Sequence, residues 1–571
     1  MMLNLNKKIK VVLIIICFSA LILLPQVNQH ALILGGDSSF HWNRIYDAMM
    51  QIKNGNFQYF VSMYGFSQSG RIVNALYGPY IAYFNGLIML IAGSWFKYQI
   101  LSDWVLNMIA SFSMYYLLRS NKVRPNYSVW LSLLFVTSYS ISTWTLNQQF
   151  LAWGTAIMPL GIAAATRMVR NHARQVNIFE LTLGVTLLIQ THVLSAIFLI
   201  IILVVFFILG MIISNNRKLM IRNILVSVVL TMLLTSNIWG ALLEVYNSNN
   251  LLPPFTNLDP LNNGVVKFLL DNSQLSIGFA LLISVQFVVI TSYYHKITRL
   301  NRMVTTIGII LLIMSTQLLP WNTIFTIFPI MSVIQFPYRL LAPATILLIL
   351  GMGLSATELS DETIQKSDNK LIILGSLIVL CTLISLGIIQ NKASIWQTNE
   401  VLASRYNVTQ IFGGERLRRE FGSQNMGDAL KYVWKPAPDY LPTNDLGNTV
   451  SPYTQYQKQI GTNNRFIKKV KNGKLIIFWI SKNTNPTTVS AVKYKHTKLT
   501  LNRNVLNKND YTLSQIGAIR LTPKIGQNIL TLEYLPSHLF KTLIIINWIS
   551  WIGLILWLGT TFVLKQRRLI N

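Results

Sequence analysis

Residues 194–214 read LSAIFLIIILVVFFILGMIIS, an apolar run without a single charged side chain. A helix of about 20 apolar residues is long enough to cross the ~30 Å hydrocarbon core of a bilayer. The run continues backwards to residue 178, and we divide it at Thr191-His192, because a histidine is costly at mid-bilayer depth and tolerated at a surface. Twelve similar runs accompany it, at residues 10–27, 78–95, 100–118, 127–145, 150–168, 178–192, 223–243, 275–293, 303–319, 340–356, 371–389 and 542–564.

The composition agrees with a membrane protein. The chain has 571 residues, of which 52% are hydrophobic and 12% are charged, whereas soluble domains carry about 25% charged residues. These values exclude a soluble enzyme, a disordered chain and a fibrous repeat. The two cysteines, Cys17 and Cys381, lie inside apolar runs and offer neither a disulfide framework nor a metal site. We therefore predict a mainly α, polytopic membrane helix bundle with about 12–13 hydrophobic segments.

The formal net charge is +29, from 48 Lys and Arg against 19 Asp and Glu. So basic a membrane protein is expected to have anionic neighbours: membrane lipids, phosphate-linked lipids or an acidic envelope polymer. We expect no nucleic-acid partner. We expect a retained first helix rather than a cleaved signal peptide, because no convincing small-residue cleavage site follows Leu24-Pro25.

Positive charge in short loops predicts the orientation. Assigning every basic cluster to the cytoplasm puts both termini there; the clusters are 7–10, 119–124, 167–174, 217–222, 295–302 and 565–568. Thirteen crossings cannot leave both ends on one side, so one run must fail to cross. The run 78–95 follows Tyr77 and contains Pro79, Asn85 and Gly86, which favours a re-entrant or interfacial segment. The alternative is that 119–126 faces outward.

Three polar pieces then lie outside: 28–77, 244–274 and 390–541. The third carries turn signals at Asn472-Gly473 and Asn509-Asp510 and alternates in polarity over 474–480, which predicts a β-rich sandwich. Residues 391–541 hold 22 Lys and Arg and 8 Asp and Glu, so 22 − 8 = +14. This excess is either a solvated surface or a contact with an anionic lipid or polymer. The domains are thus 1–389, 390–541 and 542–571, the last being a final span with a basic tail.

The first outer loop holds the main candidate site. Gly35-Gly36 ends one element, Asp37 or Ser38 can cap the next, and a helix over 38–53 closed by Asn54-Gly55 follows. Asp37, His41 and Arg44 are spaced i, i+4 and i+7 and share one side of that helix. A neighbouring stripe, Ile45, Met49 and Ile52, is expected to rest on the bilayer surface. The alternative reading is a helix cap, an interfacial ring and a headgroup anchor.

That constellation suits sugar transfer from a lipid phosphate. The reaction needs a base for the acceptor hydroxyl, which would be Asp37, and cations or donors that stabilise a departing phosphate. Arg44, Arg71 and Arg339 are candidate phosphate partners, and a divalent metal is possible although no paired-carboxylate motif is present. Other acids near the outer face are Asp47, Asp103, Glu244, Asp259 and Asp271.

Further polar residues lie at the outer ends of the predicted spans. His192 follows Gln190-Thr191 at an outer turn and is either structural or a substrate contact, and Glu244 is a possible second acid. Asn147-Gln148-Gln149 could bind sugar hydroxyls or cap a helix. In Gln335–Arg339, Pro337 breaks the helix and Arg339 either snorkels to headgroups or holds a lipid phosphate. Gln335 is a further candidate for contact with the substrate or its phosphate.

The motifs from Gly36 to Arg44 resemble a family of bacterial polytopic proteins described as "6-pyruvoyl-tetrahydropterin synthase-related, membrane". Tyr77-Gly78-Pro79-Tyr80, Gln335-Phe336-Pro337-Tyr338-Arg339 and Asp439-Tyr440-Leu441-Pro442 fit as well. The last two are also similar to YfhO-type membrane proteins, implicated in glycosylating envelope polymers, and both groups resemble the GT-C glycosyltransferase superfamily. That resemblance implies a GT-C-like fold and a catalytic acid in the first outer loop, where Asp37 stands.

The chain also departs from these patterns. GT-C enzymes often have a second acid near the first, whereas Ser38 and Ser39 stand here. No His-x-His occurs, so the pterin-synthase name implies no zinc site in this chain.

We find no Walker, Rossmann, zinc or nucleophile-elbow motif, so a sugar donor would have to arrive linked to a lipid. The leading hypothesis is a glycosyltransferase at the outer face of a bacterial cytoplasmic membrane. It would use a polyprenyl-phosphate sugar and an anionic envelope polymer or glycolipid held by the basic outer domain. The alternatives are a lipid-linked-sugar transporter, which predicts polar residues at mid-bilayer and an internal repeat, and a non-catalytic scaffold of the same fold.

Overall fold

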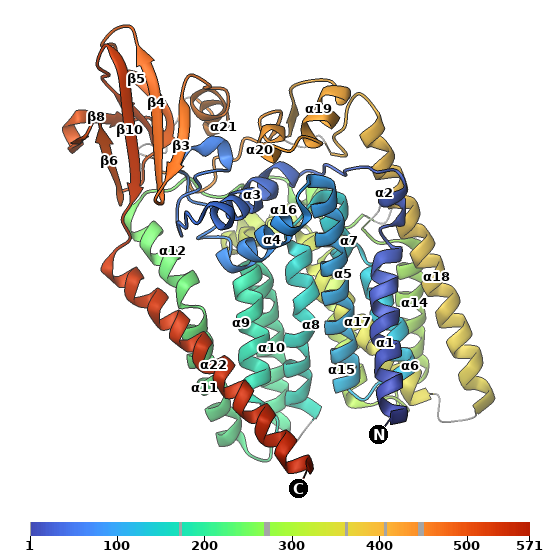
Figure 1. Cartoon of the computed structure of the whole chain (residues 1–571). Helices are drawn as coiled ribbons and strands as arrows, with labels where there is room; N and C mark the ends of the chain where they lie inside the picture. Colours follow the sequence, from blue (N-terminus) through green and yellow to red (C-terminus); the bar gives the residue numbers. More distant parts are fainter. Residues whose placement is uncertain are drawn as a thin grey trace.

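The computed structural model describes residues 2–170, 174–267, 274–359, 364–404, 408–443 and 450–570. These residues are mainly helical, and a small β region precedes the last helix. Most of the long helices run side by side in one layer, with the β region above one end of it (Figure 1). Both chain ends lie at the other end of the layer, away from the β region (Figure 1).

Five segments are long and apolar enough to cross a membrane: Pro125–Asn147 (α6, Pro125–Val136, with α7, Tyr139–Asn147), α10 (Val193–Ile213), Pro337–Glu358 (η3, Pro337–Leu340, with α17, Leu341–Glu358), Ile372–Gln397 (most of α18, Ile364–Ser394) and His538–Thr561 in α22 (His538–Ile570). A sixth is possible if α11 (Arg217–Leu234) and α12 (Ser236–Ser248) form one broken span. This is fewer than the 12–13 hydrophobic segments predicted.

The remaining predicted runs do form helices, but these are short or carry polar side chains. α4 (Pro79–Ala92), α9 (Ile178–Thr191) and α14 (Ile277–Ser292) are apolar and no longer than 17 residues. Polar side chains are buried in α5 (Trp95–Ser120), among them Gln99 and Asp103. The remaining helices in this group are α1 (Met2–Leu21), α8 (Leu151–Arg170) and α15 (Arg299–Met314).

The predicted span 223–243 is not one continuous helix. α11 and α12 meet at a bend of 62°. At this break the Leu234 carbonyl accepts hydrogen bonds from Gln190 Nε2 at 2.9 Å, Asn547 Nδ2 at 2.8 Å and Trp551 Nε1 at 3.1 Å. Side chains from two neighbouring helices thus satisfy the carbonyl at the kink, which makes the bend tolerable inside the protein.

The predicted helix of the first loop is α3 (Ser38–Asn54), and Gly55 closes it at φ 62°, where its backbone N–H reaches the Gln51 carbonyl. The helix is buried, contrary to the prediction that one stripe rests on a bilayer: Ile45 and Met49 are 1% and 5% exposed and belong to the main core. α4 crosses α3 closely at Gly86, where a Cβ would lie 2.8 Å from the Met49 nitrogen. α4 is short, and Phe84, Leu87 and Ile91 on it are exposed.

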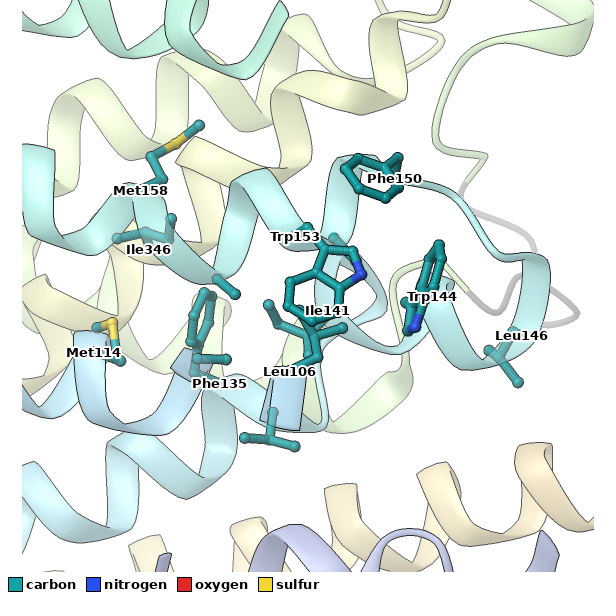
Figure 2. Packing of buried hydrophobic residues seen from close by; sticks show 14 of the residues in the cluster. Leu106, Met114, Phe135, Ile141, Trp144, Leu146, Phe150, Trp153, Met158 and Ile346 are labelled. Carbon is teal, nitrogen blue, oxygen red and sulfur yellow. The ribbon is translucent and has the colours of Figure 1, made fainter. Parts of the chain in front are cut away.

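An aromatic group supports the start of α3. The ring centroids of Phe150 lie 5.6 Å from Trp144 and 6.4 Å from Trp153. The three rings lie close together, with Leu106 and Ile141 beside them (Figure 2). The Trp144 indole donates to Ser102 Oγ at 3.2 Å, so its polar atom is satisfied inside the core.

The β region is a sandwich of two sheets. One has the order β3-β4-β10-β6-β7, and the other β5-β9-β8. Buried side chains of both sheets, such as Ile477 and Val489, form one core. The predicted turn at Asn472-Gly473 joins β3 to β4, with φ values of 51° and 68°. The strands are β3 (Ile467–Lys471), β4 (Lys474–Ser481), β5 (Thr487–Val492), β6 (Thr497–Leu501), β7 (Asn504–Val505), β8 (Tyr511–Leu513), β9 (Ala518–Leu521) and β10 (Gly526–Tyr534).

The strands of the sandwich begin at Ile467, so the β-rich part is shorter than the predicted 390–541. The described residues before it contain α19 (Gly414–Phe421), α20 (Met426–Ala429), α21 (Pro452–Tyr456) and one two-residue strand pair, β1 (Thr409–Gln410) with β2 (Val433–Trp434). Residues 433–443, which we call the strap, lead on from β2 towards the sandwich. The strap forms part of the site described next.

Candidate functional site

A cavity of about 770 Å³ opens at the N-terminal end of α3. Its volume is within the range of small-molecule sites, roughly 300–1,000 Å³. The walls come from distant parts of the chain: α3, the turn between α9 and α10, residues 253–256, residues 332–339 and the strap. Five of the predicted site residues line it, namely Asp37, His41, His192, Gln335 and Arg339.

Asp37 stands at the N-cap position of α3, yet its side chain makes no capping hydrogen bond. Its Oδ1 instead accepts a hydrogen bond from Lys435 Nζ at 2.7 Å, and the same ammonium donates to the Gly36 carbonyl at 2.9 Å. The Asp37 side chain is 36% exposed and that of Lys435 17%. Gly35 permits this turn, because a Cβ there would lie 2.2 Å from the Asn147 Cα. The carboxylate is therefore available to the cavity and already paired with a cation.

His41 is a neutral ring held in one orientation. Arg44 Nη1 lies 3.0 Å from His41 Nδ1, and since a guanidinium can only donate, Nδ1 accepts and the proton is on Nε2. The ring stacks on Phe150 at a centroid distance of 5.0 Å. Burial, followed by the positive charges of Arg44 and Lys435, holds the pKa of His41 well below 6.5. His41 can therefore donate a hydrogen bond to a ligand and is a poor proton acceptor.

Arg44 and Arg71 are predicted phosphate partners that lie behind the cavity wall rather than in it. Arg44 Nε donates to Asn74 Oδ1 and Nη2 to the Tyr77 carbonyl, both at 3.0 Å. Burial lowers the pKa of Arg44 to about 10, so it stays charged at neutral pH. Both arginines are bonded within the protein: Arg44 fixes His41, and Arg71 fixes the strap.

The strap is held over the cavity by several independent hydrogen bonds. Arg71 donates to the Ala437 carbonyl at 2.5 Å and to the Asp439 carbonyl at 2.8 Å. Ser39 Oγ donates to the Val433 carbonyl at 3.1 Å, and the Tyr494 hydroxyl to the Tyr440 carbonyl at 3.0 Å. The first loop and the sandwich thus both anchor this segment.

The strap supplies a second acid. Asp439 lines the cavity, and burial raises the pKa of its carboxyl above the ordinary value, although Arg71 and Lys435 act in the opposite direction. The predicted second acid, Glu244, lies outside the lining. Its carboxylate accepts from the backbone N–H of Ser537 at 2.9 Å and also from the Ser537 hydroxyl. Glu244 thereby ties α12 to the start of α22, and Asp439 takes its place as the second acid of the cavity.

Arg339 is the other cation of the cavity. Its Nη1 donates to Gln335 Oε1 at 2.8 Å and to the Ile334 carbonyl at 3.1 Å. Gln335 has φ 58°, and its amide donates to the Phe255 carbonyl, which fixes the turn. Among the described residues, no carboxylate forms an ion pair with Arg339. His192 lies nearby in the lining and is bonded through Nδ1 to Ser195 Oγ at 2.7 Å.

The three amide side chains before α8, those of Asn147, Gln148 and Gln149, have two different roles. Gln148 serves the backbone: it has φ 53°, and its Oε1 accepts from the Gly35 N–H at 2.7 Å. Asn147 and Gln149 line the cavity, where their amides can meet ligand hydroxyls.

Part of the cavity lining is apolar and includes side chains that are exposed at the protein surface. Val193, Leu194, Ile197, Leu242 and Val333 belong to this part. Ile197 and Val333 are 40% and 52% exposed. The surface next to Val333 is also apolar and exposed, with Ile327, Phe328 and Ile330. The cavity lining therefore combines charged groups with hydrocarbon side chains that reach the protein surface.

Two of the other predicted acids accept hydrogen bonds from the backbone. Asp47 is buried and accepts from three backbone N–H groups, while Asp259 accepts from the Asn262 N–H at the start of α13 (Pro260–Asn263). Asp103 is buried within α5, and Asp271 lies outside the described residues. Across the described ranges, no group of three or more His, Cys, Asp or Glu could hold a metal ion.

The sequence did not point to Lys435. Its partner Asp37 is 398 positions away, and no local pattern marks a lysine that reaches back to the first loop. Asp439 did belong to one of the motifs quoted for the family resemblance, but no role was assigned to it.

Comparison with models of protein families and with curated proteins finds no match to this chain.

Proposed function

We propose that the chain is a GT-C-like membrane glycosyltransferase that moves a sugar from a polyprenyl-phosphate donor to an envelope polymer or glycolipid. The observation that carries this proposal is the mixed lining of the cavity. Asp37, Asp439, Lys435 and Arg339 supply charge, and apolar side chains of the same lining, such as Ile197 and Val333, are exposed at the protein surface. An amphiphile with a sugar phosphate and a hydrocarbon chain matches such a lining.

In the proposed reaction Asp37 takes the proton of an acceptor hydroxyl. The acceptor oxygen forms a bond to the anomeric carbon of the donor sugar, and the bond from that carbon to the phosphate oxygen breaks. The phosphate leaves with the electron pair and stays attached to its prenyl chain. Lys435 and Arg339 stabilise the charge that develops on it. His41, as a hydrogen-bond donor, orients the sugar or the acceptor.

The arrangement of the chain supports a site at one membrane face. Five or six segments could cross a bilayer, and both termini lie at the end of the helical layer opposite the β region (Figure 1). We place the termini in the cytoplasm and the cavity and sandwich at the outer face of a bacterial cytoplasmic membrane. The basic clusters near the termini, 7–10 and 565–568, agree with that orientation.

The sandwich suits an anionic acceptor. Residues 465–534 contain 13 Lys and Arg but only two acids, so 13 − 2 = +11. Both acids are engaged: Glu533 pairs with Lys474 at 3.0 Å, and Asp510 accepts from the Asn507 N–H at 2.7 Å. The remaining basic side chains leave a strongly positive surface for a polymer or glycolipid that carries phosphate or carboxylate groups.

The test compares the sugar content of envelope polymers and glycolipids in cells that carry only Asp37→Asn, only wild-type protein or a deletion. Asparagine keeps an oxygen that accepts from Lys435 but removes the base, and membrane abundance controls for folding. We expect the variant to lose the sugar modification that the deletion loses. A modification that is lost on deletion and normal in Asp37→Asn would mean that Asp37 is not the base. If deletion changes no sugar, the protein is a transporter of another cargo or a scaffold.

A further inference from the structure

The pairing of Asp37 with Lys435 has a consequence for how the site becomes active. Lys435 Nζ occupies Oδ1 of the carboxylate that would take the acceptor proton. Both side chains line the cavity, and neither is completely buried, so a ligand can reach the pair. While the pair is intact, one carboxylate oxygen of Asp37 is bonded to Lys435. The ammonium then lies where an acceptor hydroxyl would have to bind.

Lys435 is not needed to hold the strap in place. The backbone on either side of it is fixed by Ser39 at Val433 and by Arg71 at Ala437. Its only other described bond is to the Gly36 carbonyl. A lysine ammonium on a flexible four-carbon stem can move within a cavity while its backbone stays fixed. The strap thus presents a mobile positive charge on a rigid support.

We propose that Lys435 is a cation that the substrate displaces: it pairs with Asp37 in the empty site and moves to the donor phosphate when the donor binds. This displacement rests on the proposed function and adds a reason why the enzyme would accept only donors that carry a phosphate. A phosphate offers several charged oxygens and competes for the ammonium more strongly than a single carboxylate does. Only a donor with a phosphate next to its sugar then frees Asp37 Oδ1, so an uncharged prenyl glycoside leaves the base paired.

The proposal predicts opposite effects from the two halves of one ion pair. We would measure binding of a short-chain prenyl phosphate to the full-length protein in detergent micelles by tryptophan fluorescence, with the matching prenol as an uncharged probe. Lys435→Met is expected to weaken prenyl phosphate binding about 10- to 100-fold, since it removes a charge-assisted hydrogen bond. Asp37→Asn is expected to tighten it roughly 1.5- to 5-fold, because Lys435 no longer has to leave a charged partner. The double variant should bind like Lys435→Met.

The surface pair Asp428 and Lys431, with its Nζ 2.6 Å from Oδ1, is the matched control. Asp428→Asn and Lys431→Met should leave prenyl phosphate binding unchanged. Lys435→Arg keeps the charge and reports whether loss of binding follows from misfolding, together with the thermal unfolding temperature of each variant.

Each outcome of these binding measurements either supports or contradicts the displacement of Lys435 by the donor phosphate. Opposite shifts in the two single variants support displacement. Weaker binding in both, or no change in either, overturns it while leaving the transferase proposal intact, because the wild-type protein still binds the donor headgroup. Wild-type protein that prefers prenol, or binds neither probe, overturns the displacement proposal and removes the support for a lipid-phosphate donor as well.

Discussion

The buried charged residues of the first loop and α3 are hydrogen-bonded within the protein, whereas many charged residues of the sandwich are exposed. Arg44, Asp47 and Arg71 are each no more than 1% exposed and are hydrogen-bonded within the protein. In the sandwich, basic residues greatly outnumber acids, and strand residues such as Lys469, Lys471 and Lys498 are exposed. Buried charges must be satisfied or they destabilise the fold, whereas exposed charges contribute little to stability and act on partners. The buried charged side chains of the first loop and α3 hold the local structure together, whereas many charged side chains of the sandwich are exposed to solvent and to partners.

The largest effect expected from this contrast is on folding, at Asp47. Its Oδ1 accepts from the backbone N–H groups of Met63, Tyr64 and Gly65 at 2.8, 2.7 and 3.1 Å. Asp47→Ala leaves these donors unpaired, and we expect a loss of about 4 kcal/mol in the free energy of unfolding. This loss is measured by thermal unfolding in detergent and by the abundance of the variant protein in membranes. Asp428→Ala, on the surface, is the control, and equal losses in both variants would contradict the contrast.

A smaller effect is expected from pH, through His41. Burial, Arg44 and Lys435 lower its pKa in the folded protein. The unfolded chain then binds the proton more readily, so stability that is present at neutral pH is lost as the pH falls below about 6.5. In His41→Gln the drop in unfolding temperature between pH 7 and pH 5 should shrink. The exposed His538 gives the control His538→Gln, which should keep the wild-type drop; identical profiles for all three proteins would argue against a buried neutral imidazole.

The smallest effect on stability is expected in the sandwich. Lys469→Glu with Lys471→Glu should change the free energy of unfolding by less than about 0.5 kcal/mol. The same variant should bind an anionic polymer, such as a poly(glycerol phosphate), several-fold more weakly at low salt, and the difference should fade as salt screens the charges. Lys53→Glu with Lys97→Glu changes the net charge equally on exposed residues outside the sandwich. If that pair weakens polymer binding as much, total charge matters and the sandwich is not a binding surface.

Local features of the fold could be predicted from the sequence. The bounds of α3 follow from glycines and polar residues at its ends, and helical spacing put Asp37, His41 and Arg44 on one side. The turn at Asn472-Gly473 and the alternation beside it gave the sandwich. Hydropathy alone does not give the number of spans, because it cannot tell a lipid-facing helix from one whose polar residues are bonded to neighbours, as Gln99 of α5 is.

The site was predicted only in part, for a similar reason. Spacing on one helix identifies which residues share a side, but it does not say which of them a second segment will cover. Arg44 and Arg71 looked like ligand-binding cations and turned out to be bonded within the protein. Lys435 and Asp439 enter the cavity through a strap whose path depends on tertiary contacts, and a single sequence contains no local record of those contacts.

The strap also sets the time at which this protein can begin to work. Asp37 and Lys435 are 398 residues apart, so at typical synthesis rates the ribosome adds the lysine tens of seconds after the aspartate. Until then the first loop has no cover over its cavity, and Arg71 has no carbonyl of the strap to hold. A nascent chain that stalls before the strap would carry Asp37 without the strap residues of the cavity, Lys435 and Asp439. Synthesis of the strap is thus the event that adds the last charged residues to the cavity lining.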